Sequence, residues 1–219
     1  MTNFIPIFPL EIVVYPTEHL NLHIFEPRYK QLIAECFAQQ KPFGIPSVIG
    51  GTMKEFGTLV EILSIEKRYE NGEMDIRTRG LKVFRVLETI RDVPDKLYSG
   101  AIVHYPRNIR QGNDELMQKI LRSIRELHAL LKVSRDFSTP EAELSSYDVA
   151  HHAGLQPEEE YEMLCLMQER QRQEYLRRHL GKAIPLLAEM ENLKQRIQLN
   201  GHFRNLPGYP SDPASQAEQ

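Results

Sequence analysis

Apolar residues in the first half of the chain follow the two-residue repeat of β-strands. The stretch HLNLHIF at residues 19–25 alternates apolar and polar side chains, which places them on opposite faces of a strand. Further stretches rich in β-branched and aromatic residues lie at 57–69, 73–80, 81–90 and 99–106. Three early prolines, Pro6, Pro9 and Pro16, suit strand ends, edges or bulges because proline has no N–H for a central ladder.

Two local signals divide these strands. Asn71-Gly72 lies between two of them and predicts a hairpin with a type I′ turn, since both residues tolerate positive φ. Pro27 predicts the first residue of a helix, where the missing N–H would be unpaired in any case. The apolar stripe of this helix consists of Tyr29, Leu32, Ile33, Cys36 and Phe37.

After Pro106 the repeat changes to that of helices. Asn113 is the predicted N-cap of a helix whose buried stripe is Leu116, Ile120, Ile124, Leu127 and Leu131. Ser145 and Asp148 have the spacing of a capping box. A longer helix is predicted from Pro157 to about residue 185, followed by a last helix at 186–199.

These patterns predict an α+β protein with two lobes. Residues 1–106 form an antiparallel β-barrel or twisted-sheet lobe with one crossover helix, and residues 107–200 form an all-α helical-bundle lobe. Residues 201–219 are rich in turn-forming and disorder-forming residues and are predicted to be a flexible tail.

Composition supports a folded protein without a membrane span. The chain has 219 residues, 41% apolar and 26% charged, with a net charge of −3. No apolar run approaches the roughly 20 residues of a transmembrane helix, and the N-terminus lacks the pattern of a secretory signal, so we expect the cytoplasm. Cys36 and Cys165 are both interpreted as buried free thiols.

No catalytic residue, cofactor or metal site is predicted. Gly181-Lys182 lacks the earlier glycine and the preceding strand of a phosphate-binding loop. A hydrolase is disfavoured because no nucleophile–base pair is visible. The adjacent His151 and His152 point about 100° apart on a helix, and His19 and His23 lie about 13 Å apart on a strand, so neither pair suits one ion.

Basic residues raise nucleic-acid binding as an alternative. The group of Arg170, Arg172, Arg177, Arg178 and Lys182 is interleaved with glutamates and is interpreted as a solvated helix face. A second group, Arg77, Arg79 and Lys82, lies in the β-rich half, with Arg77 and Arg79 on one strand face. RNA binding through this second group is the alternative function, although the acidic net charge makes nucleic acid an improbable partner.

The stretch PIFPLEIVVYPTEHLNLHIFEPRY at residues 6–29 closely resembles the N-terminal substrate-recognition domain of Lon-type ATP-dependent proteases. The resemblance extends over roughly residues 4–200, through Phe43-Gly44, Gly57-Thr58 and ENGE at 70–73. It reaches RGLKVFRV at 79–86, where Val83 and Phe84 replace the usual Arg-Phe pair.

The resemblance implies a PUA-like β-lobe and a non-catalytic module that binds unfolded or damaged polypeptide, with a separate ATP-dependent protease as a possible partner. No counterpart of the ATPase phosphate loop or the Ser–Lys protease module of a full Lon protease is found in the sequence, and the oligomeric state is left open. Pro185 is expected to interrupt the long helix of the family. The residues expected to bind polypeptide or to form its motif are Tyr15, Phe25, Glu26, Arg28, Tyr29 and Phe43; for Glu26 and Arg28, fixing the strand-to-helix turn is the competing interpretation.

Overall fold

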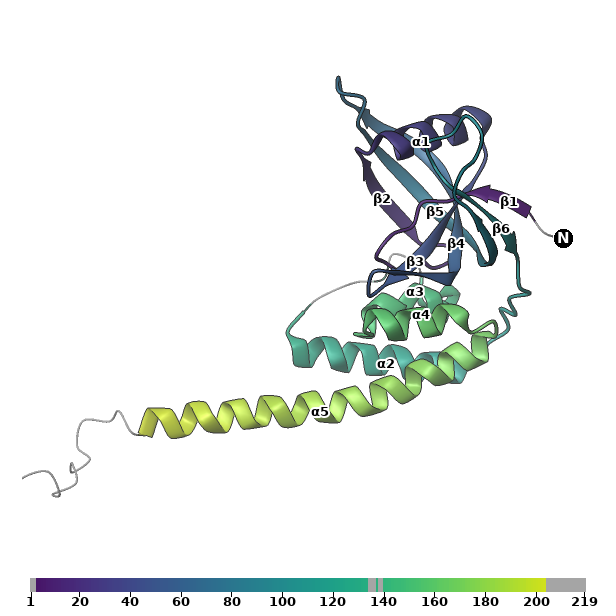
Figure 1. Ribbon diagram of the computed structural model, residues 1–219. Coiled ribbons are helices and arrows are strands. Elements are labelled where there is room, and N and C mark those ends of the chain that lie inside the picture. Colours follow the sequence, from purple (N-terminus) through teal and green to yellow (C-terminus); the bar gives the residue numbers. More distant parts are fainter. Residues whose placement is uncertain (1–2, 134–136, 138–139, 204–219) are drawn as a thin grey trace, which may run out of the picture.

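The computed structural model describes residues 3–133, 137 and 140–203. A β-rich lobe lies above a helical lobe, and the last helix extends well beyond both (Figure 1). In chain order the elements are β1 (Asn3–Pro6), β2 (His19–Ile24), α1 (Pro27–Gln39), β3 (Phe43–Ile49), β4 (Thr52–Arg68), β5 (Met74–Ile90), β6 (Gly100–His104), α2 (Asp114–Leu131), η1 (Glu141–Glu143), α3 (Ser146–Val149), η2 (Ala150–His152), α4 (Pro157–Cys165) and α5 (Glu169–Phe203).

All strand pairs among the named strands are antiparallel, in the order β1-β6-β5-β4-β3, with β2 also paired to β5. The two longest strands, β4 and β5, have 17 residues each and pair along most of their length. The first part of β5 pairs with β2 and its last part with β6, so β5 has a different neighbour at each end. The predicted α+β class, with α1 as the one crossover helix, is confirmed.

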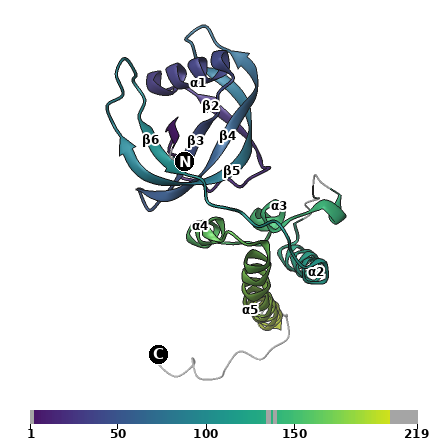
Figure 2. The ribbon, with the colours of Figure 1, turned by 90° about the vertical axis from the view of Figure 1, so that its right-hand side faces the viewer.

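The segment after β1 links the two ends of this sheet. Residues 7–10 run parallel to β3, with bridges from Ile7 to Gly44 and from Leu10 to Ser47. The Phe8 N–H donates to the Gly44 carbonyl at 2.8 Å. The sheet therefore curls strongly, with α1 lying across one open end and the helical lobe below the other (Figure 2).

The hairpin between β4 and β5 forms as predicted, but its turn differs. Gly72 has φ 79°, whereas Asn71 is not among the residues with positive φ. The Gly72 N–H donates to the Tyr69 carbonyl, and the Tyr69 N–H donates to the Glu73 carbonyl, both at 2.9 Å. This is the three-residue loop in which an ordinary turn is followed by a left-handed glycine, and it corrects the predicted type I′ turn.

Helix α1 begins at Pro27 as predicted and covers the sheet with its apolar stripe. Tyr29, Leu32, Ile33 and Cys36 are buried in a cluster with residues of β3, β4 and β5. Phe37 is a correction, because its side chain is 40% exposed. It lies at the margin of the stripe, outside the cluster that α1 forms with the sheet.

Helix α2 confirms the predicted cap and part of its stripe. The Asn113 side chain accepts the Leu116 N–H at 2.8 Å. Met117 and Leu121 are buried in the core of the helical lobe, whereas the predicted Leu131 is exposed at the end of the helix.

The helices after residue 157 break at a different place from the predicted one. The chain leaves helical conformation between α4 and α5, at residues 166–168, and α5 then runs for 35 residues through Pro185. Pro185 lies inside this helix, although proline lacks the N–H for one helical hydrogen bond and its ring crowds the carbonyl four residues earlier. The expectation that Pro185 interrupts this helix is therefore wrong. Of the predicted tail, residues 201–203 belong to α5, and 204–219 lie outside the described residues.

The two lobes share one hydrophobic cluster. Val13, Tyr15, Ile49 and Val83 of the β-lobe are buried with the core of the helical lobe. The predicted lobe boundary at 106/107 lies between β6 and α2 and stays a prediction. Both cysteines are free, but only Cys36 is buried, because Cys165 at the end of α4 is partly exposed.

Candidate functional site

Two cavities meet where the lobes join. One has a volume of about 500 Å³ and the other about 690 Å³, and they have five lining residues in common. We call the hollow around these residues the interlobe groove, and its shared lining consists of Pro16, Thr17, Leu144, Tyr147 and Asp148. The larger cavity continues over the start of β2, and the smaller one lies against α2 and α5.

A strained turn lies at the centre of the groove. Thr17 has φ 74°, which is rare for a β-branched residue and is found mostly where surrounding contacts enforce it. Its N–H donates to the Gly80 carbonyl at 2.9 Å, and its hydroxyl donates to Asp148 Oδ1 at 2.9 Å. A Cβ on Gly80 would lie 2.1 Å from the Tyr15 carbonyl oxygen, so only glycine allows the turn to lie against β5.

His151 connects the lobes across the groove. Its Nδ1 lies 2.7 Å from Glu160 on α4, and its Nε2 lies 3.2 Å from Glu18 beside the turn. Burial by itself would lower the pKa of His151, but the hydrogen bonds with Glu160 and Glu18 outweigh it and raise the pKa to about 10. The imidazolium is therefore the stable form at neutral pH, and it joins one carboxylate from each lobe.

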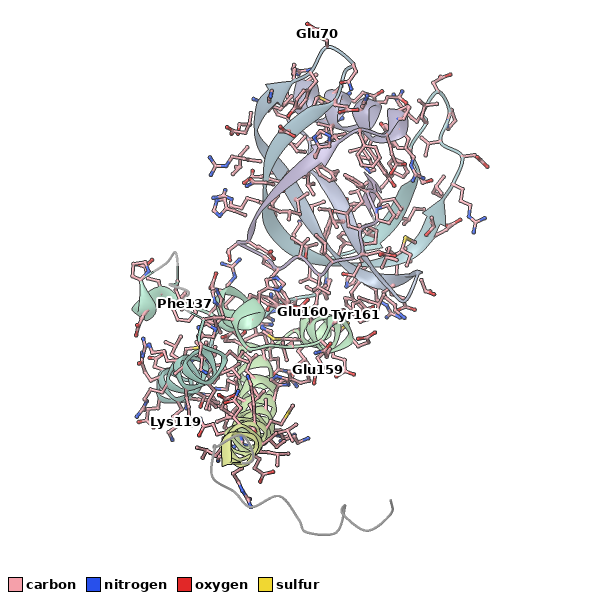
Figure 3. All side chains as sticks on the ribbon, turned by 90° about the vertical axis from the view of Figure 1, so that its left-hand side faces the viewer. Glu70, Lys119, Phe137, Glu159, Glu160 and Tyr161 are labelled. Atoms are coloured by element: carbon pink, nitrogen blue, oxygen red, sulfur yellow. The ribbon has the colours of Figure 1, made fainter. Side chains whose placement is uncertain are left out.

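Backbone groups add two neutral contacts between the lobes. The Tyr15 hydroxyl donates to the Glu160 carbonyl at 3.0 Å, and burial raises the pKa of this phenol, which keeps it a donor. Tyr161 accepts the Phe56 N–H at 3.2 Å. Glu160 and Tyr161 both lie at the junction of the two lobes (Figure 3). These contacts join the β-lobe to α4.

A buried ion pair supports the smaller cavity. The Arg172 guanidinium donates to Glu169 at 2.8 Å and to Ser146 at 2.9 Å, and the Arg172 side chain is only 1% exposed. Its guanidinium also lies 4.0 Å from the centre of the Tyr147 ring. The assignment of Arg172 to a solvated basic face is therefore wrong, since it fixes α3 against α5.

The residues expected from the sequence to contact polypeptide fall into two groups. Tyr15, Tyr29 and Phe43 are buried, so they support the β-lobe from within and cannot contact a ligand in this conformation. The exposed group is Phe25, 58% exposed, with Glu26 and Arg28, whose carboxylate and guanidinium lie 2.7 Å apart. Only this second group, at the start of α1, is accessible to a polypeptide.

The residues of the RNA alternative do not form one patch. Arg77 and Arg79 are exposed on the same face of β5, as expected, but Arg79 is paired with Glu61 at 2.6 Å. A register shift in the β4–β5 ladder separates them from Lys82, whose ammonium lies 3.8 Å from the centre of the Tyr105 ring in another cavity. A phosphate at Arg79 would compete with a carboxylate.

Neither a metal centre nor a membrane span is found in the part of the chain that the structure describes. No group of three or more His, Cys, Asp or Glu side chains there could hold an ion. No described helix is long and apolar enough to cross a bilayer.

Comparison with known proteins identifies this architecture. A family model described as "ATP-dependent protease La (LON) substrate-binding domain" matches residues 5–182. The crystal structure of a Lon N-terminal domain protein from Xanthomonas campestris is similar, with a TM-score of 0.60 and 22% identity over 80% of this chain and 96% of that one. The N-terminal domain of a Lon protease from the Mycobacterium avium complex gives a TM-score of 0.58 and 14% identity over 82% of this chain and 98% of that one.

Proposed function

This chain belongs to the Lon substrate-binding domain family, and we propose that it binds unfolded or damaged polypeptide, non-catalytically, in the interlobe groove. The observation that carries this proposal is the meeting of two cavities over Thr17 at the lobe junction. Binding sites in proteins are commonly concave, with apolar walls and a few fixed polar groups.

The lining of the groove suits a polypeptide segment. Leu81, Phe137 and Leu144 give it apolar surface, while Asp148 and His151 provide fixed polar groups. Unfolded chains offer both apolar side chains and unpaired backbone groups, whereas a folded protein buries most of them. A preference for unfolded over folded forms of the same protein is therefore expected.

The direct test is fluorescence anisotropy with a labelled globular protein in its folded form and in a reduced, alkylated and permanently unfolded form. Gln118 on α2 is exposed and lines the smaller cavity, so Gln118→Trp should fill it and weaken binding of the unfolded form. Lys119→Trp is the matched control, because Lys119 is the next residue along the helix, is exposed and does not line the groove (Figure 3).

Three outcomes separate the possibilities. Binding of the unfolded form that is lost in Gln118→Trp and kept in Lys119→Trp supports the groove. Equal binding by both variants would show that the binding site lies outside the groove. No preference for the unfolded form by the wild-type protein would overturn the proposal, and salt-sensitive binding of single-stranded RNA in its place would favour the alternative function.

The cellular role that follows is protein quality control, with a separate ATP-dependent protease as the partner. The proposal rests on the family, whose name refers to substrate binding by such a protease. Its test is the rate at which a purified Lon protease degrades the unfolded protein with and without this chain. An unchanged rate would restrict the proposal to binding alone.

A further inference from the structure

Strand β2 is paired on one side only. Its partner is β5, and within the described part of the chain no other strand pairs with it. Figure 1 shows β2 along the outer side of the β-lobe. The opposite side of β2 is therefore a sheet edge.

The hydrogen bonds at the start of β2 show which backbone groups point to this edge. The Glu18 carbonyl accepts the Gly80 N–H at 2.8 Å, and the Leu20 carbonyl accepts the Thr78 hydroxyl at 2.9 Å, so these residues face β5. Backbone groups of successive strand residues point in opposite directions within the sheet. The N–H and C=O groups of His19, Asn21 and His23 therefore point outward, away from β5.

The fold covers the outer side of β3 but leaves this edge open. At β3, residues 7–10 occupy the outer side, and the Val48 N–H donates to the Leu10 carbonyl at 2.8 Å. Edge strands are usually protected by proline, by lysine or other charged side chains, or by bulges. The β2 sequence HLNLHI contains no proline and no Lys, Arg, Asp or Glu, and its register with β5 is unbroken.

Both ends of the β2 edge reach surfaces that polypeptide could contact. His19 lines the larger cavity of the interlobe groove. At the other end, the exposed Phe25 ring lies 6.2 Å from the His23 ring. The strand between them is about 17 Å long at roughly 3.4 Å per residue, so the edge connects the groove to the exposed residues at the start of α1.

We propose that polypeptide binds this protein by adding an extended strand to the free edge of β2, with one end of the strand in the interlobe groove. This inference rests on the proposed function and specifies its binding mode. The occupant follows from the edge itself, because outward N–H and C=O groups at every second residue match only another extended backbone. The side chains of the bound strand contribute less to affinity than its backbone. We therefore expect polypeptides of many different sequences to bind.

The protein variant that tests this mode is Asn21→Pro, with Asn21→Ala as its control. Proline removes the outward N–H, and the fold tolerates it because proline is accepted on edge strands where the N–H faces solvent. We expect Asn21→Pro to weaken binding of the unfolded, alkylated protein about tenfold, since one hydrogen bond is lost and its acceptor is left unpaired. Asn21→Ala keeps the N–H and should bind within about twofold of the wild type, because an exposed side chain contributes little.

Hydrogen exchange on the wild-type protein gives an independent readout. Saturation with the same unfolded protein should slow exchange of the His19, Asn21 and His23 amides, while the amide of Lys194 in α5, the helix that extends beyond both lobes (Figure 1), keeps its rate. Wild-type binding without slowed exchange at these amides, or with full affinity in Asn21→Pro, overturns the edge mode and leaves the proposed function intact. Failure of the wild-type protein to bind overturns both.

Discussion

His151 and His23 lie near opposite ends of β2. Each has two carboxylates as neighbours, but the surroundings of the two histidines differ. His151 in the interlobe groove and His23 near the β4–β5 hairpin each lie between two carboxylates, and the nearer carboxylate oxygen is 2.7 Å away in both cases. His151 joins the two lobes, whereas His23 joins β2 to Glu73 in the β4–β5 hairpin and to Asp75 on β5.

The exposure of each histidine determines how much its ion pairs contribute to stability. The His151 side chain is 36% exposed and that of His23 is 49% exposed. The pKa of His151 reaches about 10, while the hydrogen bond with Asp75 raises the pKa of His23. Ion pairs in solvent contribute little to stability, so the same side chains form a link between lobes in one place and a minor surface contact in the other.

Substitutions of the glycines near the two ends of β2 should give the largest difference in the free energy of unfolding. Gly80→Ala places a Cβ 2.1 Å from a backbone oxygen of Tyr15, and we expect a loss of about 3 kcal/mol in the free energy of unfolding. Gly72→Ala in the hairpin meets only the Lys30 side chain at 4.0 Å, so it should lose about 1 kcal/mol, because of its left-handed φ alone. Urea denaturation of both variants measures the two losses.

Equal losses in the two glycine variants would contradict the close packing at the groove. Gly181→Ala provides the control, since a Cβ there meets nothing within 4 Å. It should stabilise the protein by up to about 1 kcal/mol, because alanine is the better helix former.

The pH dependence of stability should come second in size. Because the pKa of His151 is raised from 6.5 to about 10, its contribution is fully present below pH 6.5 and is lost as the pH rises toward 10. Solvent screening of a side chain that is one-third exposed reduces this contribution to about 1–2 kcal/mol. His151→Gln should remove this part of the pH dependence in urea denaturation between pH 6 and 10. A variant whose stability falls with pH as in the wild type would show that other groups cause the loss.

The smallest effect belongs to His23. His23→Gln should leave the urea midpoint unchanged within error at neutral pH, because the pair it removes lies in solvent. The imidazole should titrate above the usual histidine value in an NMR titration, since its hydrogen bond with Asp75 raises the pKa. A pKa for His23 equal to or above that of His151 would reverse the comparison.

Features set by neighbours in sequence were predictable. Pro27 begins α1 and Asn113 caps α2, because a missing N–H and a short polar side chain act within one helical turn. The turn type at Asn71-Gly72 and the helix break near residue 166 were not. Either turn suits that dipeptide, and a proline weakens a helix locally without fixing where a long helix breaks.

The groove could not be predicted, because its parts are distant in sequence. The Thr17 hydroxyl meets Asp148 across a separation of 131 residues, and no local pattern indicates that they approach. Tyr15 and Phe43 were expected to contact polypeptide but lie in the core. The sequence could not show this, because an apolar residue looks the same whether it is buried or exposed. Phe25, which the family resemblance indicated, is exposed, and its contact with polypeptide stays a prediction.

The pairing of the first strand has a consequence for synthesis. β1 pairs with β6, so Asn3 finds its partner in Val103 and Phe4 finds its partner in Ile102. A ribosome that adds roughly 5–20 residues per second needs about 5–20 s to make the intervening chain. Throughout that interval the amino-terminal segment has no β6 to pair with, and Ile5, which ends up buried, lies in water. The polypeptide that this protein is proposed to capture thus resembles its own nascent amino terminus.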